Sequence, residues 1–385
     1  MNAQISISGI SSISALGTTQ DEVWQAYFSG RPLFSKKKLG VKEEWVSVIP
    51  RDTENLLIHL QRTNTLYKKL DRSVLLAILA AKRAFSSADY LNKNIGVNIG
   101  SSRGATRLFE DSHERFIAGD GVSAYTSPTT TLGNISSWVG QEIGIEGVEI
   151  GHSVTCSTSL HAILNGIAWL KADMADAFVV GGSEAALTPY TLAQMKAMKL
   201  YSNAPSLLAC ESMNFQKKSN TMVIGEAAGV AVLEKGVSVR TQGIILGYGF
   251  ASEKLDHLSS ISETGVCFQK SMVMALQKAQ LEEVDVIVMH APGTVKGDIS
   301  ELTAIKKVFD KELPLLTSNK WLVGHTFGAS GMLNIEMAIL MLKHNKFIEN
   351  PFFNNERHLP IEIKTVLVNA VGFGGNAVSI IISKP

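Results

Sequence analysis

Short segments that are apolar almost throughout alternate with longer amphipathic segments, and this alternation constrains the fold more than any other feature. Apolar segments rich in β-branched residues lie at 95–99, 284–289 and 366–371, as expected of strands buried on both faces. Apolar residues recur at helical spacing in 71–84 and 331–343, and the first of these begins with Asp, a preferred N-cap. Alternating strands and helices predict an α/β fold built in layers.

The chain has 385 residues, which is long for one simple core, since a domain has about 100–200 residues. The segment 235–242 lies between two strand-like runs and is the candidate hinge. On each side of it the chain has a strand, a turn of small residues and a helix, with reactive residues at the turn. We therefore expect two related halves, residues 1–238 and 239–385.

Composition excludes several classes of protein. Hydrophobic residues make up 45% of the chain and charged residues 18%, which predicts a large core rather than disorder. The formal net charge of +1 offers no general attraction for nucleic acid or a membrane surface. No apolar run approaches the ~18–20 residues of a membrane span, and the N-terminal MNAQISISGI lacks the basic region of a signal peptide. The three cysteines form no C-x-x-C pair, so the spacing of a zinc finger is absent. An odd, sparse cysteine count is typical of a reducing compartment, so we expect a cytoplasmic protein.

Cys156 lies where a strand-like run gives way to small residues and then to a long helical segment. At a helix N-terminus the dipole and the free backbone N–H groups favour a thiolate, and they could hold the oxyanion of an attached acyl group. A buried cysteine that only fills the core is the more common case. The residues alone leave both interpretations open.

Two histidines lie at similar turns in the second half of the chain. His290 follows an apolar strand and precedes a Pro-Gly turn, and ligand sites cluster beyond the carboxyl ends of strands in α/β sheets. His325 lies between Gly324 and Gly328, which allow the backbone to approach a ligand closely. Each also has a structural interpretation, His290 as a packed core residue and the Gly-rich run after His325 as a tight helix contact.

Together these segments resemble the β-ketoacyl-acyl-carrier-protein synthases, the elongating condensing enzymes of fatty-acid and type II polyketide synthesis. The resemblance spans nearly the whole chain, and its motifs follow one another in the family's order. The matching positions are the T-A-C-A-T-S-like turn at Cys156, the G-G-x-E turn at 181–184, the V-x-G-E-G-A-G-like strand at 223–229, the H-G-T-x-T-x-x-G-D motif from His290 to Asp298, the K-x-x-x-G-H-x-x-G-A-x-G motif from Lys320 to Gly331, and the G-F-G-G-x-N end at 372–376.

Two related classes fit less well. The thiolases would have a second cysteine near the last motif, and residues 366–380 contain none. The initiating condensing enzymes have asparagine where this chain has His325. The resemblance is therefore to the elongating enzymes.

The resemblance implies a thiolase-like α/β fold, with layers in the order α-β-α-β-α and the active site between two related halves. It implies a β-ketoacyl-[acyl-carrier-protein] synthase that joins an acyl group on Cys156 to malonyl-carrier protein by decarboxylative Claisen condensation. In this scheme, His290 and His325 donate hydrogen bonds to the enolate that forms when carbon dioxide leaves.

Further residues receive supporting roles from the same resemblance. Lys320 would orient and tune the histidines, with Glu301 as its partner. The backbone N–H of Phe373 would join that of the nucleophile as the oxyanion hole, and the Phe373 ring would act as a gate to the acyl tunnel. Asp298 and Thr294 occupy supporting positions in the first histidine motif.

The resemblance requires no metal and no organic cofactor, because the carrier protein supplies the phosphopantetheine arm of both substrates. A zinc site formed by Cys156 and the two histidines is an alternative, although the motif glycines suit thioester access better than a closed metal shell. Lys68, Lys69 and Arg72 could dock an acidic carrier protein or could simply form a solvated helix end. The family is dimeric, so we expect a homodimer or a heterodimer with a homologous subunit.

Some residues depart from the family pattern. Ala291 and Pro292 replace the Gly-Thr after the first histidine, Asn334 replaces an acidic residue, and 211–214 reads E-S-M-N in place of R-P-F-D. These departures suggest a specialised pathway. Fatty acids, aryl polyene pigments and other polyketides all remain open as products.

Three other functions fit the sequence less well than condensation. A non-condensing acyltransferase of the same fold would not need both histidines and Lys320. A chain-length-factor-like partner subunit, which shapes a tunnel, would typically lack Cys156. A nucleotide-binding protein is suggested by G-S-S-R-G at 100–104, but that segment lacks both phosphate-binding fingerprints.

Overall fold

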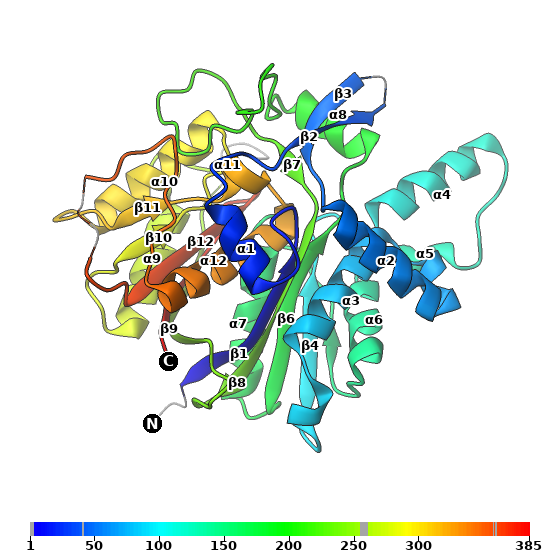
Figure 1. Cartoon of the computed structure of the whole chain (residues 1–385), viewed down its shortest axis with the longest axis horizontal. Helices are drawn as coiled ribbons and strands as arrows, with labels where there is room; N and C mark the ends of the chain where they lie inside the picture. Colours follow the sequence, from blue (N-terminus) through cyan, green and yellow to red (C-terminus); the bar gives the residue numbers. More distant parts are fainter. Residues whose placement is uncertain (1–3, 41, 255–260, 357, 359) are drawn as a thin grey trace.

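The computed structural model describes residues 4–40, 42–254, 261–356, 358 and 360–385 (Figure 1). Within these ranges ten strands form one mixed sheet. Their order across the sheet is β11 (Leu315–Thr317), β10 (Val286–Val288), β12 (Thr365–Gly372), β13 (Asn376–Ser383), β9 (Gly243–Ser252), β1 (Ile5–Ile13), β8 (Ala227–Lys235), β6 (Ala177–Glu184), β4 (Ile95–Gly100) and β5 (Glu149–Ile150). A smaller sheet contains β2 (Ser35–Leu39), β3 (Lys42–Ser47) and β7 (Ile224–Gly225).

The strand order is repeated on the two sides of the β1–β9 junction. On each side, the parallel strands lie at the outer edge (β5-β4-β6 and β11-β10-β12) and two antiparallel strands lie towards the junction (β8-β1 and β13-β9). The two sides meet where Ile5–Ile7 pairs with Gly243–Ile245. This repetition is the observation behind the two-halves interpretation, and the boundary at residue 238 stays a prediction.

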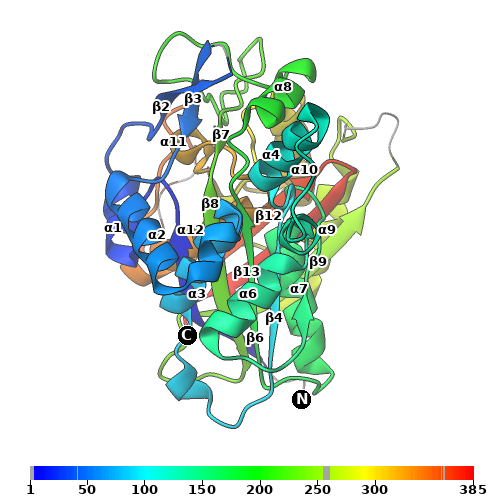
Figure 2. The same ribbon diagram turned by 90° about the vertical axis from the view of Figure 1, so that its right-hand side faces the viewer.

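Helices cover the outer face of the sheet on each side of the β1–β9 junction and fill the space between these two parts of the sheet (Figures 1 and 2). On one face, α3 packs against β1, β6 and β8, and α6 packs against β4, whereas on the other face α9 packs against β9 and β13 with α10 beside it. Between the two sides, α7 contacts β4, β6 and β8, and α12 contacts β1, β8, β12 and β13. These helices are α3 (Arg72–Ala84), α6 (Asn134–Ile143), α7 (Thr158–Lys171), α9 (Val266–Ala279), α10 (Val295–Val308) and α12 (Ser330–His344). The predicted α-β-α-β-α layering is confirmed.

The central helix α12 is buried along nearly its whole length, with every residue from Ser330 to Leu342 inaccessible to solvent. Each fully buried leucine or isoleucine contributes about 1.5–3 kcal/mol of hydrophobic stabilisation. Its approach to α7 is close, because a Cβ on Gly331 would lie 2.7 Å from Leu160 Cγ. A glycine is needed where the two central helices touch, which is the packing role expected for the Gly-rich run after His325.

The remaining helices lie at the periphery. They are α1 (Gln20–Tyr27), α2 (Arg51–Thr63), α4 (Thr106–Ala118), α5 (Thr126–Thr130) and α8 (Pro189–Ala197). The short α11 (Lys320–Val323) is buried instead. Helices α4 and α5 form an arm that projects from the body (Figure 1). The arm carries exposed apolar side chains at Phe109, Phe116, Ile117, Val122 and Tyr125. No helix in the described part of the chain is long and apolar enough to span a bilayer.

Candidate active site

Cys156 lies at the predicted strand-to-helix turn, immediately before the N-cap Ser157 of α7. The turn is tight, because Thr155 takes a left-handed φ of +47°. The cysteine is 5% exposed, and burial raises the pKa of its thiol to about 12, with the negative charge of Glu184 adding to the rise. Burial therefore opposes the effect expected of the helix N-terminus, and a thiolate at Cys156 stays a prediction.

His290 and His325 lie side by side, with ring centroids 5.1 Å apart and planes nearly perpendicular at 86°. Burial lowers the pKa of His325 to about 3, with Lys320 adding to the effect, and it lowers the pKa of His290 well below its usual value. Both imidazoles are therefore neutral at physiological pH, so each has one N–H to donate and one nitrogen able to accept a proton. Among the described residues, neither Nδ1 atom has a hydrogen-bond partner.

A hydrogen bond from the backbone N–H fixes the position of each histidine. His290 lies two residues after the end of β10, and its N–H donates to Glu301 Oε1 at 2.9 Å. The N–H of His325 donates to the carbonyl of Val223 at 2.7 Å, which ties the second histidine motif to β7. The rings are thus positioned from two separate parts of the chain.

One cavity of about 230 Å³ brings these groups together. It is lined by Cys156, His290, His325, Phe373, Glu301 and Thr294, and also by Leu200, Asn220, Met222, Ile261, Phe268, Pro292, Lys296, Gly297, Val371 and Gly372. Lys320 and Asp298 are not among the lining residues. In the described ranges no three His, Cys, Asp or Glu side chains are grouped as metal ligands, so the zinc interpretation gains no support.

The segment carrying Phe373 lies against the nucleophile turn. Thr155 Oγ1 donates to the carbonyl of Phe373 at 3.4 Å. A Cβ on Gly372 would lie 2.0 Å from Thr155 Oγ1. Gly374 has a left-handed φ of +108°, which only glycine adopts without strain. The glycines that flank Phe373 therefore permit both the close approach and the turn.

Lys320 lies behind the histidines and is 1% exposed. Its Nζ donates to Asn319 Oδ1 at 3.1 Å and to Asn334 Oδ1 at 3.3 Å. Glu301, the predicted partner, acts on Lys320 through its charge, whereas these two amides are the hydrogen-bond partners of the ammonium. The Glu301 carboxylate instead accepts from the N–H groups of His290 and Ala291, both at 2.9 Å, and from the side chain of Asn369 at 3.1 Å.

Glu301 still acts on Lys320 through its charge. Burial lowers the pKa of Lys320 to about 8, and the nearby Glu301 carboxylate opposes this shift. Burial also raises the pKa of Glu301 to about 7. The acidic residue displaced along α12, Glu336, contacts Ser12 and not Lys320, and burial raises its pKa to about 7 as well.

The two remaining supporting residues stabilise the start of α10. Thr294 is its N-cap, and its hydroxyl accepts from Gly297 N–H at 3.2 Å. Asp298 is fully buried and pairs with Lys217, a residue that the sequence did not single out.

The predicted docking cations separate into two groups. Lys68 and Lys69 are exposed, and Lys69 Nζ lies 3.8 Å from the centroid of the Tyr125 ring. Arg72 is partly exposed, and its guanidinium lies 2.7 Å from Glu226 and 2.6 Å from Glu54. All three stay predicted docking charges, but only the charge of Arg72 is already paired with carboxylates of the chain.

Glu184 is the acidic residue of the G-G-x-E motif, for which the sequence predicts no function. It is completely buried, its Oε1 accepts from Gly328 N–H at 3.2 Å and from Ser102 N–H, and its Oε2 has no partner in the described structure. Burial raises the pKa of Glu184 to about 7. Its position could have indicated a functional role, because an acidic residue at the end of a wholly buried strand is costly to desolvate.

Known protein families and individual relatives match this chain along nearly its whole length. Residues 2–237 match the family described as "Beta-ketoacyl synthase, N-terminal domain", and residues 242–353 match "Beta-ketoacyl synthase, C-terminal domain". The chain is 27% identical to 3-oxoacyl-[acyl-carrier-protein] synthase 1 of Buchnera aphidicola, over 99% of both proteins. It is 26% identical to 3-oxoacyl-[acyl-carrier-protein] synthase 2 of Staphylococcus aureus, over 100% of this chain and 99% of the relative.

Solved structures share the fold. The ishigamide ketosynthase/chain length factor superposes with a TM-score of 0.85 at 20% identity, over 100% of both chains. The ketosynthase ApeO in complex with its chain length factor ApeC, from Xenorhabdus doucetiae, gives a TM-score of 0.83 at 24% identity, over 100% of this chain and 98% of that one. The thiolase-like fold class is confirmed.

Proposed function

This chain belongs to the β-ketoacyl synthase family, and we propose that it joins an acyl group carried on Cys156 to malonyl-[acyl-carrier-protein] with loss of carbon dioxide. It is an acyltransferase of the condensing type. The observation that carries the proposal is the cavity in which Cys156 faces two neutral, buried histidines. A simple acyl transfer needs a nucleophile and an oxyanion hole, whereas an enolate needs the additional pair of donors.

The first half-reaction acylates Cys156. Because the thiol is protonated in the empty site, a neutral imidazole in the same cavity is the base suited to accept its proton. The sulfur attacks the carbonyl carbon of the acyl thioester, and the resulting oxyanion accepts hydrogen bonds from the N–H groups of Cys156 and Phe373. The carbon–sulfur bond to the carrier breaks, and the carrier thiolate takes up the proton.

The second half-reaction extends the chain. The malonyl group loses carbon dioxide, and the electrons of the broken carbon–carbon bond pass into an enolate. The enolate oxygen accepts hydrogen bonds from His290 and His325, each worth about 2.7–4 kcal/mol in the transition state. The enolate carbon attacks the acyl carbonyl on Cys156, and the thiolate that leaves recovers a proton. Lys320 positions this site and keeps it electropositive.

Phosphopantetheine would reach Cys156 from the side of Thr294 and Lys296, which line the same cavity. Lys296 is exposed there and suits the phosphate of the arm. Lys68 and Lys69 are the candidate contacts for an acidic carrier protein. No cofactor beyond this arm is needed for either half-reaction.

A second subunit would cover the arm formed by α4 and α5. Its exposed apolar side chains make a surface typical of a protein interface. Two structural neighbours are named as a ketosynthase with a chain length factor, so the partner is either a second copy of this chain or a homologous subunit. The product, a β-ketoacyl group on a carrier protein, would enter fatty-acid or polyketide synthesis, which includes the aryl polyene pathway.

The test uses carrier proteins loaded with acyl chains of different length, followed by malonyl-carrier protein, with intact mass as the readout. We expect an acyl adduct that is lost in Cys156→Ala and kept in Cys267→Ala, a matched buried cysteine. We then expect a β-ketoacyl carrier longer by two carbons. Acylation without extension would favour a plain acyltransferase or a missing partner subunit. The absence of acylation with every donor would favour a chain-length-factor-like scaffold.

A further inference from the structure

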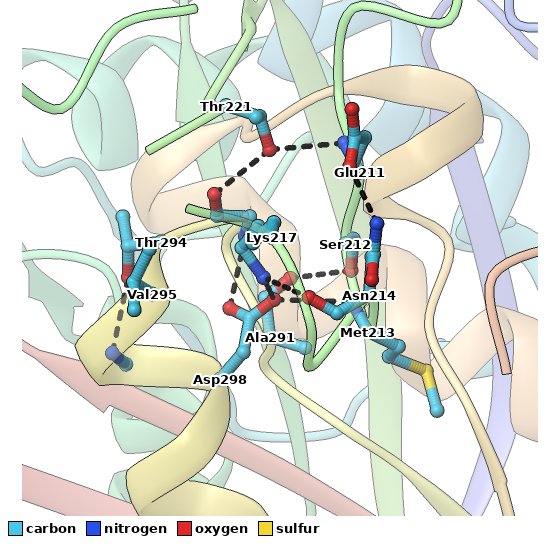
Figure 3. Close-up of polar contacts among 12 residues, drawn as sticks. Glu211, Ser212, Met213, Asn214, Lys217, Thr221, Ala291, Thr294, Val295 and Asp298 are labelled. Atoms are coloured by element: carbon cyan, nitrogen blue, oxygen red, sulfur yellow. Dashed lines mark hydrogen bonds and ion pairs between the residues drawn. The ribbon is translucent and has the colours of Figure 1, made fainter. Parts of the chain in front are cut away.

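The loop that carries His290 is clamped by a second segment, residues 211–221, which the proposed chemistry does not use (Figure 3). Ser212 Oγ donates to the carbonyl of Ala291 at 2.6 Å, and Thr221 donates twice to the carbonyl of Gly293, from its N–H at 2.8 Å and from its hydroxyl at 2.9 Å. Segment 211–221 therefore binds the loop directly after His290 through three hydrogen bonds.

A buried ion pair also links the two segments, and we call segment 211–221 with these contacts the clamp. Lys217 Nζ lies 2.7 Å from Asp298 Oδ2, and the two side chains are 3% and 0% exposed. The Asp298 carboxylate also accepts from Met213 N–H and Gly293 N–H, both at 3.0 Å, so it bonds to both segments (Figure 3). A buried pair with its remaining lone pairs satisfied is stable, whereas removal of one partner leaves an uncompensated charge.

The clamped loop is strained at the residue next to the histidine. Ala291 has a φ of +25°, outside the regions that an alanine adopts freely. Such a conformation persists only where the surroundings over-determine it. Glu301 holds the N–H groups of His290 and Ala291 from one side, and Ser212 holds the Ala291 carbonyl from the other.

We infer that Lys217 is a positioning residue for His290, acting through Asp298, and that it governs the decarboxylation half-reaction more strongly than the acylation of Cys156. The inference rests on the proposed function. Cys156 belongs to the turn before α7, and in the described structure the hydrogen bonds of segment 211–221 do not reach it. A shift of the 290–298 loop would therefore move His290, one of the two enolate donors, while leaving the nucleophile and His325 in place.

The test compares Lys217→Met with the wild type in two separate assays on the full chain. Malonyl-carrier protein decarboxylation should fall by about 10–100-fold in kcat, because a displacement of about 1 Å in a positioned group costs this much. Acylation of Cys156 by an acyl-carrier protein should fall by clearly less, because Cys156 and His325, the second imidazole able to accept the thiol proton, lie outside the 290–298 loop. The same substitution at Lys82, whose ion pair with Glu142 lies on the α3–α6 face, should leave both rates unchanged.

A double variant separates positioning from stability. Lys217→Met with Asp298→Asn removes the unpaired charge, so the melting temperature should return towards the wild type while decarboxylation stays low. The inference is overturned if the double variant regains decarboxylation together with stability, or if Lys217→Met slows both half-reactions equally. Should the single variant not fold, the double variant decides by the same two assays. Failure of the proposed function is distinct, because the wild type would then show neither half-reaction.

Discussion

Lys320 Nζ lies 3.3 Å from Asn334 Oδ1, so the buried ammonium beside the two histidines has an amide on the central helix as its partner. Burial lowers the pKa of Lys320 to about 8, and the charge of Glu301 opposes this shift only in part. Lys320 is therefore poised to lose its proton just above physiological pH.

Decarboxylation should consequently fall as the pH rises through about 8, where Lys320 becomes neutral. Asn334→Asp would place a carboxylate beside the ammonium and move this limb of the pH profile upward. The measurement is the rate of malonyl-carrier protein decarboxylation between pH 6 and 10, with the exposed Asn92→Asp as control. An unchanged limb in Asn334→Asp would show that another group sets it.

Glu184→Gln should make the Cys156 thiol more reactive. The Glu184 charge raises the pKa of this thiol, and both backbone donors bond to Oε1, so glutamine can keep those bonds while losing the charge. Each pKa unit by which the thiol falls increases the thiolate fraction about tenfold. Alkylation by iodoacetamide at pH 8, read at Cys156 by mass spectrometry, should therefore accelerate. Equal rates in the two proteins would contradict the assignment.

Glu336→Gln should stabilise the protein at high pH and not at low pH. Burial raises the pKa of Glu336 to about 7 from a usual 4.5, so this carboxyl contributes stability that is fully present below pH 4.5 and is lost as the pH rises through 7. The neutral variant avoids that loss, which amounts to at most about 3 kcal/mol. Chemical unfolding at pH 5 and pH 8 measures the difference. The exposed Glu43→Gln is the control, and a gain of equal size at both pH values would argue against this origin.

Gly372→Ala should impair acylation of Cys156. The added Cβ would lie 2.0 Å from Thr155 Oγ1 and 2.7 Å from the carbonyl of Val154, so either the turn before the nucleophile or the Phe373 loop must move. We expect a loss of about 100-fold in the acylation rate, the usual effect of a 1 Å misplacement. Gly133→Ala, where a Cβ meets no atom within 4 Å, is the matched control. Wild-type acylation in Gly372→Ala would show that the turn tolerates the shift.

Much of the architecture could be predicted from local patterns. Segment 71–84 begins with a helix-capping Asp, and the structure has Asp71 accepting from Ser73 N–H at 2.8 Å at the start of α3. The strand before His290 and the helix after Gly331 were equally visible, because hydrophobic periodicity and turn residues act over a few neighbouring positions. The order of the motifs likewise indicated that Cys156, His290 and His325 would share a site, and they line one cavity.

The electrostatics of that site depend on groups far apart in the chain. The sequence predicted a thiolate at Cys156 from its place before a helix, but the pKa of a buried thiol is governed by the atoms that exclude water from it. The partner of Lys320 was expected to be Glu301, which instead bonds to the backbone of the His290 loop. Such choices among competing partners are made only when the segments pack.

The sequence by itself determined the layered fold, the positions of the reactive turns and the family, since each depends on short-range pattern or on ordered motifs. Only the tertiary structure decided which polar groups are buried together. It engaged Arg72 with two carboxylates, gave Lys217 to Asp298, and left one oxygen of Glu184 without a partner among the described residues. The reason is that desolvation and hydrogen-bond satisfaction are properties of a packed environment, and no single segment of the chain contains that environment.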